Sequence, residues 1–342
     1  GSHWVAFNYK PFPSTFWPTN GSTDDVMIRL PAQFRQDTDG NYNLDVYRAN
    51  LAIVEATIKN MTEISSLPVD EKAIGKDLDG DKRLTIANGI TDTSAYVGQA
   101  KDIYKEDYLY PVGTEFFHTV RYLGFNDDGS IGVSRRMKEV RYMKKWRFYN
   151  KNVYKRYYDV EAMEKEMGHL PGYNHLGDYG LDNSFGWSIQ GFIEDRKGEL
   201  RVSTYEENTF CMGCHSSIGG TIDKTFSFAR KVEGADGWGY INLKGMPDAP
   251  TVGESQGEIV TYLERVGGGS EFRNNDEIRA RWFTEEGKLD YKKINAAQDV
   301  YDLIVPSKGR ALELNKAYRV IVEDQDFIFG RDATVTPCLL YT

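Results

Sequence analysis

The feature that most constrains this chain is the pentapeptide Cys211-Met212-Gly213-Cys214-His215. Two cysteines three positions apart, with a histidine directly after them, have the spacing at which two thiols add to the vinyl groups of a haem while the histidine ligates the iron. The chain holds only three cysteines and five histidines, so chance is a poor explanation for this arrangement. The pattern predicts one covalent haem c, attached at Cys211 and Cys214, with His215 as the proximal iron ligand.

Other uses of a C-x-x-C pair fit the sequence less well. A structural zinc site needs about four ligands, and no second Cys/His cluster follows at zinc-finger or zinc-ribbon spacing. A thioredoxin-like redox pair needs a βαβ setting, which the surrounding residues do not predict. The third cysteine, Cys338, is left without a thiol partner, which excludes an intrachain disulfide framework.

At this pentapeptide the chain resembles the c-type cytochromes. The resemblance implies a periplasmic or extracellular location of the bacterial type, because haem is attached to thiols outside the bacterial cytoplasm. The first residues, Gly1-Ser2-His3, are typical of a cleavage scar, so we expect a native export signal to have been removed ahead of them.

The sixth iron ligand would decide the function. Met246, flanked by Gly245 and Pro247, is the only methionine after the pentapeptide. His118, within an apolar stretch, is the second candidate. Either ligand would give a low-spin electron-transfer haem, for which the partner would be a redox protein or a small-molecule donor or acceptor.

An open distal site is the alternative. The order of strands before the pentapeptide, over about residues 108–232, resembles cytochrome P460 and the β-sheet cytochromes c′. That resemblance implies a five-coordinate haem that binds nitric oxide or oxidises hydroxylamine. P460 cross-links a lysine to its haem, whereas the stretch 113–123 contains no lysine and carries His118. Whether the chain is an enzyme, a carrier or an accessory protein with a structural haem stays open.

Two acidic loops, 37–48 and 77–88, resemble the calcium loops of EF-hands, with oxygen donors at positions one, three and five. Both lack the glycine at position six and the glutamate at position twelve. The alternative interpretation is ordinary turn chemistry. The second loop is the better calcium candidate, because the first has a cation, Arg48, at position twelve. The candidate ligands of the second loop are Asp77, Asp79, Asp81, Thr85 and, through its backbone carbonyl, Arg83.

Charge and hydropathy limit the partners. The net charge of -9 argues against a nucleic-acid partner. No run of eighteen apolar residues is present, so the sequence predicts no transmembrane segment.

The pattern of elements predicts an α+β fold with an antiparallel sheet at its centre. We expect an N-terminal arm and helical region with the acidic loops at 4–107, a β-rich haem domain at 108–240, and a helical region at 241–342. Predicted strands lie at 113–123, 131–137, 140–149, 187–193, 200–202 and 226–228. Predicted helices lie at 46–64, 160–167, 256–266, 275–283, 291–304 and 310–326.

Overall fold

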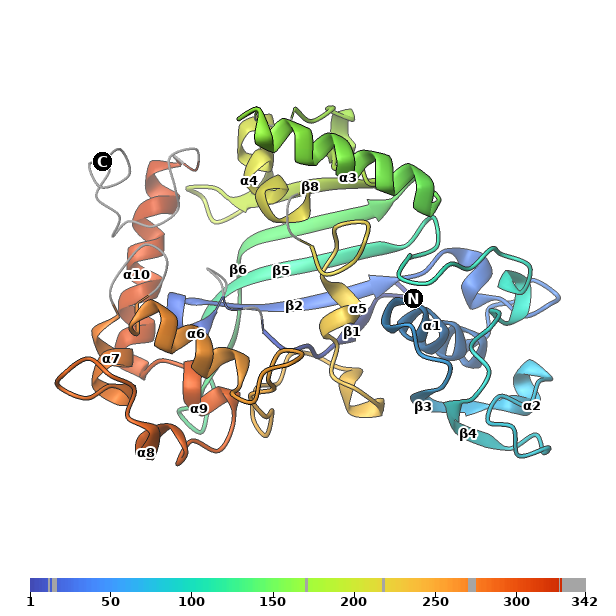
Figure 1. Cartoon of the computed structure of the whole chain (residues 1–342), viewed down its shortest axis with the longest axis horizontal. Coiled ribbons are helices and arrows are strands. Elements are labelled where there is room, and N and C mark those ends of the chain that lie inside the picture. The colour runs from blue at the N-terminus through green and yellow to red at the C-terminus, as the bar shows by residue number, and fades with distance from the viewer. Residues whose placement is uncertain are drawn as a thin grey trace.

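The computed structural model describes residues 1–11, 13, 17–169, 172–216, 219–269, 275–325 and 327. One antiparallel sheet runs through the middle of the molecule, and helices pack around it (Figure 1). The predicted α+β class with an antiparallel sheet is therefore confirmed. Cys338 lies outside the described residues.

Within the described residues, seven strands form the main sheet, in the order β1-β2-β5-β6-β8-β7, and β9 also pairs with β8. Neighbouring strands are all antiparallel. The strands are β1 (Val5–Phe7), β2 (Ser22–Arg29), β5 (Glu115–Phe125), β6 (Ile131–Lys145), β7 (Leu181–Asp182), β8 (Trp187–Glu194) and β9 (Leu200–Val202). The predicted strands 131–137 and 140–149 are joined in one strand, β6, which ends at Lys145, so residues 146–149 lie outside it.

The sheet begins earlier in the chain than predicted. The weak periodicity of residues 4–24 predicts an extended arm or a linker, yet these residues supply β1 and the start of β2. Strand β1 pairs with β2, and β2 pairs with β5, so both extend the sheet. The main sheet therefore crosses the predicted boundary at 107/108. The outer side of β1 is covered in turn by residues 231–239, through backbone bonds such as Asn8 N to Gly237 O (2.8 Å) and Gly239 N to Ala6 O (3.0 Å).

A helical lobe with its own two-stranded sheet forms one end of the molecule (Figure 1). It contains α1 (Leu44–Lys59), β3 (Ile64–Asp70), α2 (Glu71–Ile74) and β4 (Ile86–Ile90). Asn43 caps α1 by accepting bonds from two backbone N–H groups, and Asn60 ends it in the left-handed conformation. Twelve of its sixteen residues are buried, so α1 runs through the core instead of lying on the surface.

The other end is helical and is built by the last third of the chain (Figure 1). Its helices are α6 (Glu258–Val266), α7 (Asp276–Trp282), α8 (Tyr291–Ile294), α9 (Val300–Ile304) and α10 (Lys308–Asp324). The predicted helix 291–304 is interrupted at residues 295–299, because Asp299 caps a new helix, α9. This region has its own hydrophobic cluster, which includes Met246, Ile259, Leu263 and Trp282.

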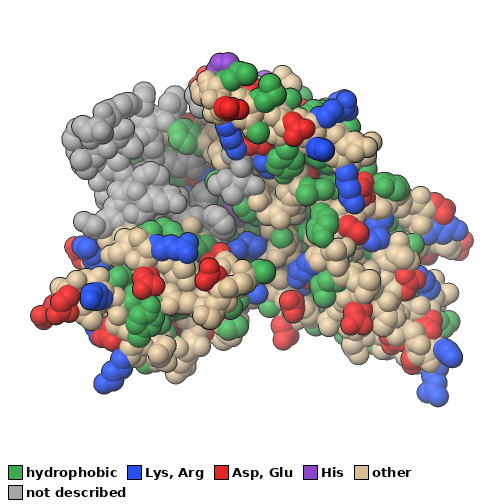
Figure 2. Space-filling model, in the orientation of Figure 1, with side chains coloured by type: hydrophobic (Ala, Val, Ile, Leu, Met, Phe, Trp, Pro, Cys, Tyr) green, Lys and Arg blue, Asp and Glu red, His purple; other side chains and the backbone are tan. Residues whose placement is uncertain are grey.

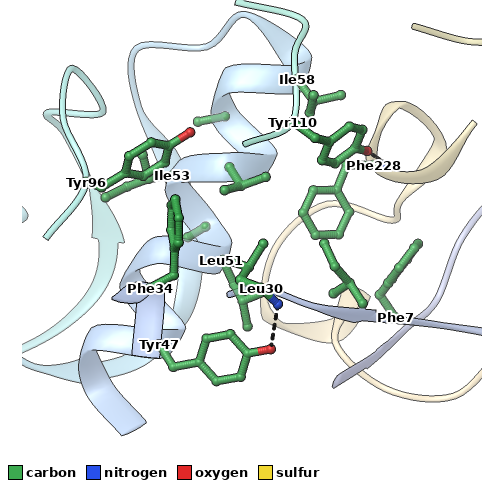
Figure 3. Close-up of a cluster of buried hydrophobic side chains, with 14 of the residues drawn as sticks. Phe7, Leu30, Phe34, Tyr47, Leu51, Ile53, Ile58, Tyr96, Tyr110 and Phe228 are labelled. Carbon is green, nitrogen blue, oxygen red and sulfur yellow. Dashed lines mark hydrogen bonds between the residues drawn. The ribbon is translucent and has the colours of Figure 1, made fainter. Parts of the chain in front are cut away.

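Helix α3 (Lys151–Glu166) lies between β6 and β7 in the chain. Two further helices, α4 (Tyr205–His215) and α5 (Ser227–Arg230), follow β9. The helix predicted at 160–167 is the second half of α3. The strand predicted at 226–228 is wrong, since Ser227 begins the short helix α5. The aromatic residue Phe228 packs in the core, where it is fully buried against Phe7 and Tyr110 (Figure 3).

Aromatic side chains from the sheet and α1 residues meet in the largest hydrophobic cluster, part of which is drawn in Figure 3. Tyr110 is central to it: its ring makes edge contacts with Phe116 at 5.2 Å and with Trp187 at 5.6 Å between centroids. The Tyr110 hydroxyl accepts a bond from the backbone N–H of Phe228 at 2.9 Å, so its polar end is satisfied inside the core.

The surface carries both signs of charge. On the face shown in Figure 2, Lys and Arg side chains are interspersed with Asp and Glu. Among the helices that the structure describes, none combines the length and the apolar character needed to cross a membrane.

Candidate functional site

The C-x-x-C-H pentapeptide forms the end of α4, and a capping box fixes where that helix begins. The Thr204 hydroxyl accepts from the Glu207 backbone N–H, while the Glu207 carboxylate accepts from the Thr204 N–H. Arg201 binds the same carboxylate through two bonds of 2.7 and 2.9 Å. Because hydrogen bonds hold both the start of α4 and the Glu207 carboxylate, the direction of the helix is defined, and with it the direction of its last turn.

Glycine at position 191 lets α4 lie directly against β8. A Cβ at Gly191 would stand 2.9 Å from Ser203 Oγ and 3.0 Å from Asn208 Oδ1. Because glycine has no Cβ, α4 can approach closely, and the Gly191 N–H donates to Asn208 Oδ1 at 2.8 Å. The pentapeptide is therefore carried by a helix that is bonded to the sheet.

Cys211, Cys214 and His215 stand at positions i, i+3 and i+4, so they share one helix face. Cys211 is buried in the largest hydrophobic cluster, and Cys214 is exposed. Within the described part of the chain, these three side chains do not bring ligand atoms within 4.8 Å of one another.

His215 is half-buried and its imidazole is kept neutral. Burial, and next electrostatic interaction with Arg141 and His118, lowers the pKa of His215 to about 3. Its ring contacts Phe226 edge-on at 5.4 Å between centroids. The Nδ1 atom is buried, and among the residues described nothing bonds to it.

A fully buried ion pair holds the loop that follows His215. Lys145 Nζ on β6 donates to Asp223 Oδ2 at 2.5 Å, and Trp187 Nε1 donates to the same oxygen at 2.9 Å. Asn183 then joins the loop to the helix end, since its Nδ2 donates to the backbone oxygens of His215 (3.0 Å) and Asp223 (3.3 Å). The position of His215 therefore depends on contacts from the sheet.

The two candidates for a sixth iron ligand, His118 and Met246, lie in different parts of the structure. His118 lies on β5 opposite Arg141 of β6, and both influence the His215 charge. The His118 Nε2 bonds Asp24 Oδ2 at 2.5 Å, and the Tyr9 hydroxyl donates to the same oxygen. Burial and that carboxylate raise the pKa of Tyr9 well above its usual value. Met246, by contrast, packs in the hydrophobic cluster of the C-terminal helices.

The second acidic loop brings four carboxylates together. Oxygen atoms of Glu71, Asp77, Asp79 and Asp81 all lie within 4.8 Å of one another. Glu71, in the first turn of α2, is fully buried, whereas Asp81 is exposed. Glu71 Oε1 accepts from the backbone N–H groups of Leu78 (2.5 Å) and Asp79 (3.3 Å), so this side chain shapes the loop as well as completing the cluster.

The backbone of this loop follows the EF-hand pattern although its sequence departs from it. Lys82, at the position where an EF-hand has glycine, adopts the left-handed conformation with φ of 67°. Asp77 accepts from Gly80 N at 2.7 Å and from Lys82 N at 2.9 Å, which closes the loop around its first carboxylate. Thr85 contributes its N–H, bonded to Glu71 Oε2 at 2.8 Å. The backbone N–H of Arg83 donates to Asp81 at 2.7 Å.

The first acidic loop shows turn chemistry. Asp37 Oδ1 accepts from the N–H groups of Asp39 (3.0 Å) and Asn41 (2.9 Å), and Gly40 has φ of 89°. Within the described residues, it does not gather three metal-type ligands as the second loop does.

Glu71 was missed by the sequence interpretation. An EF-hand obtains its last carboxylate from position twelve, after the loop, where this chain has Asn88. Glu71 comes before the loop and reaches it because Asp70, at the end of β3, pairs with Ile86, at the start of β4, and the Glu71 N–H donates to Thr85 O at 3.0 Å. The only available sequence signal was an acidic residue after Asp70, which caps α2.

Comparisons with known proteins point to a lipoprotein family. A family model whose description reads "-like lipoprotein" matches residues 1–302. A protein of Aquifex aeolicus (strain VF5), named an uncharacterized lipoprotein, is 32% identical over 366 aligned positions. The alignment covers 96% of this chain and 60% of that relative, so the chain spans less than two thirds of the relative's length. No solved structure matches.

These findings correct the cytochrome interpretation. The predicted resemblance to c-type cytochromes, including the P460 group, is wrong as an assignment of family, because the matching family is one of lipoproteins. The predicted redox functions, electron transfer and P460-like chemistry, are withdrawn with it, together with the redox partner. A five-residue pattern does not report the fold around it, which is why the assignment failed. The covalent haem at Cys211 and Cys214, with His215 as ligand, stays a prediction.

Proposed function

Because this chain belongs to the lipoprotein family whose model matches residues 1–302, we propose that it is a calcium-binding lipoprotein of the cell envelope. The ion would be held by the 77–85 loop together with Glu71. The family supports an exported, membrane-anchored protein, and a periplasmic or extracellular position is part of the proposal.

One observation carries the calcium proposal: four carboxylates have oxygens within 4.8 Å of one another. Calcium binds oxygen ligands at about 2.3–2.6 Å, so ligands on opposite sides of the ion are about 4.6–5.2 Å apart. The cluster thus has the width of a calcium coordination shell. Without a cation, each pair of like charges at this separation would repel by about 1 kcal/mol in water and about 3.5 kcal/mol at an effective dielectric constant of 20.

Calcium takes six to eight oxygen ligands, which the loop is able to supply. Glu71, Asp77, Asp79 and Asp81 provide carboxylates, while the carbonyl of Arg83 and the side chain of Thr85 stand at the positions that complete an EF-hand shell. A carboxylate has about four lone-pair sites, and Glu71 uses three for backbone N–H groups. One site remains for an ion. All these donors are oxygens, which favours calcium over zinc.

Isothermal titration calorimetry with CaCl2 tests the proposal. We expect binding heat for the unaltered chain and none for the double variant Asp79→Ala, Asp81→Ala. The matched control is Asp37→Ala, Asp39→Ala in the first loop, which should bind calcium as the unaltered chain does. Equal heats for both double variants, or no heat for the unaltered chain, would refute a calcium site at 77–85.

The location has its own test. Cells that express the complete gene are fractionated, and protease is added to intact cells and to spheroplasts. Digestion only in spheroplasts indicates the periplasm, and digestion in intact cells indicates the outer surface. Protection in both would contradict the proposed location.

A further inference from the structure

A cavity of about 560 Å³ lies among the C-terminal helices, away from both α4 and the calcium loop. Its walls come from the segment before α6, from α8 and from the residues 295–299 that connect α8 to α9. This volume is in the range of roughly 300–1,000 Å³ that small-molecule sites have. The floor is apolar, formed by Val260, Ile294 and Leu303, all of which are buried.

Uncharged hydrogen-bonding groups line the rim. Ser255, Asn295 and Gln298 are exposed, and within the described residues their side chains make no hydrogen bond. Tyr291 stands beside them, and its ring position is fixed because its hydroxyl bonds Gln256 Oε1 (3.2 Å) and Glu264 Oε1 (3.1 Å). The rim therefore offers amide and hydroxyl groups, with an aromatic ring held in place.

Two carboxylates, Asp248 and Asp299, are set rigidly into the wall. Asp248 accepts from the N–H groups of Ile259 (2.9 Å) and Val260 (3.0 Å) at the start of α6. A side chain at Gly257 would meet Asp248 Oδ2 at 2.1 Å, so glycine is needed for this approach. Asp299 caps α9 and also accepts from Gly245 N at 2.7 Å.

The charges of the lining select against anions. No Lys, Arg or His is among the described residues that line the cavity, so an anionic ligand would meet no countercharge. The backbone N–H groups at the helix starts offset part of the negative charge of Asp248 and Asp299. What remains is a set of fixed hydrogen-bond acceptors above an apolar floor.

We propose that this cavity binds a short neutral oligosaccharide. A sugar ring has the matching chemistry: its hydroxyls pair with amides and carboxylates, and its C–H face packs on apolar and aromatic surface. An envelope lipoprotein would meet such glycans on the cell surface, but the argument from the cavity is independent of calcium.

Saturation-transfer NMR on the full chain tests the inference, with maltotriose, cellotriose and chitotriose as probes. We expect transfer to at least one trisaccharide, and at least a tenfold weaker affinity in the double variant Asn295→Ala, Gln298→Ala. Both residues are exposed, so the variant should fold normally. The control is Asn152→Ala, which removes an exposed amide from α3 and should leave binding unchanged.

Two results would overturn the inference. One is the absence of transfer to all three trisaccharides. The other is binding that persists in the double variant at the affinity of the unaltered chain. Binding of a trilysine peptide in place of the sugars would also refute it, since it would show that Asp248 and Asp299 act as charges.

Discussion

Replacing Glu71 by Gln should reveal whether this buried carboxylate holds calcium or only holds the loop. Glu71 accepts three backbone N–H bonds, one on Oε2 from Thr85 and two on Oε1. Glutamine has only one acceptor oxygen, so its NH2 group would face at least one of these donors. A buried donor left without a partner costs about 1–3 kcal/mol. Glu71→Gln should therefore lower the free energy of unfolding by that amount even in EGTA.

The calcium contribution is additional and separable. With free calcium at a hundred times its dissociation constant, binding stabilises the folded chain by about 2.7 kcal/mol. Asp81→Asn provides the contrast, because Asp81 is exposed and its N–H partner Arg83 can still bond the amide oxygen. It should lose most of the calcium-dependent increment while keeping nearly the stability of the unaltered chain in EGTA.

Thermal unfolding followed by circular dichroism, with calcium or with EGTA, measures both effects. The unaltered chain should unfold at a higher temperature in calcium, Asp81→Asn at nearly the same temperature in both buffers, and Glu71→Gln at a lower temperature in both. The reasoning fails if calcium does not raise the unfolding temperature of the unaltered chain or of either variant, while Glu71→Gln still unfolds at a lower temperature than the unaltered chain. Glu71 would then only hold the loop.

Three further variants test other parts of the structure. Lys145→Met should cost about 3–5 kcal/mol of stability in urea unfolding, because it leaves the buried charge of Asp223 unpaired; a loss below 1 kcal/mol would contradict a tight pair. His215→Gln should reduce the loss of folding stability between pH 6.5 and about 3. The pKa of His215 is lowered to about 3 in the folded chain, so in this range the unfolded chain binds a proton that the folded chain does not, and stability is lost as the pH falls. Each pH unit of this range corresponds to about 1.4 kcal/mol. An unchanged acid limb would argue against a neutral His215. If the haem prediction is correct, chain matured in a host that attaches haem c should keep a pyridine haemochrome spectrum after denaturation, and Cys211→Ala with Cys214→Ala should abolish it; a colourless unaltered protein would end that prediction.

Local patterns predicted local structure well. The strand 200–202 is present as predicted, and the strand 113–123 differs from β5 by two residues at each end. The capping box of Thr204 and Glu207 likewise follows the local T-x-x-E pattern. These features depend on contacts within a few residues, such as a side-chain oxygen that accepts a backbone N–H three positions later. The residues that form each of these patterns are also the residues that make the stabilising contacts.

Long-range pairing was not visible in the same way. β1 joins the sheet because Val5, Ala6 and Phe7 pair with β2, but three residues carry too weak an alternation to predict a strand. Glu71 likewise enters the acidic cluster only through tertiary folding. The phenylalanines at 226 and 228 suggested a strand, yet the partner surface for Phe228 decided the conformation.

The assignment of family from Cys211 to His215 failed for a related reason. A short motif specifies the chemistry that a few side chains are able to perform, and says little about the hundreds of residues around them. The family matches use 302 residues of the chain, against five in the pentapeptide.

The ends of the main sheet have a consequence for how this protein behaves at high concentration. A long exposed strand offers unpaired N–H and C=O groups to other molecules and invites edge-to-edge aggregation. Here the long strands β5 and β6 are internal, one edge ends in the short strands β7 and β9, and the other ends in β1 beneath residues 231–239. Loss of β1 would turn the eight-residue strand β2 into an open edge, so the first ten residues protect the protein against self-association as well as extending its sheet.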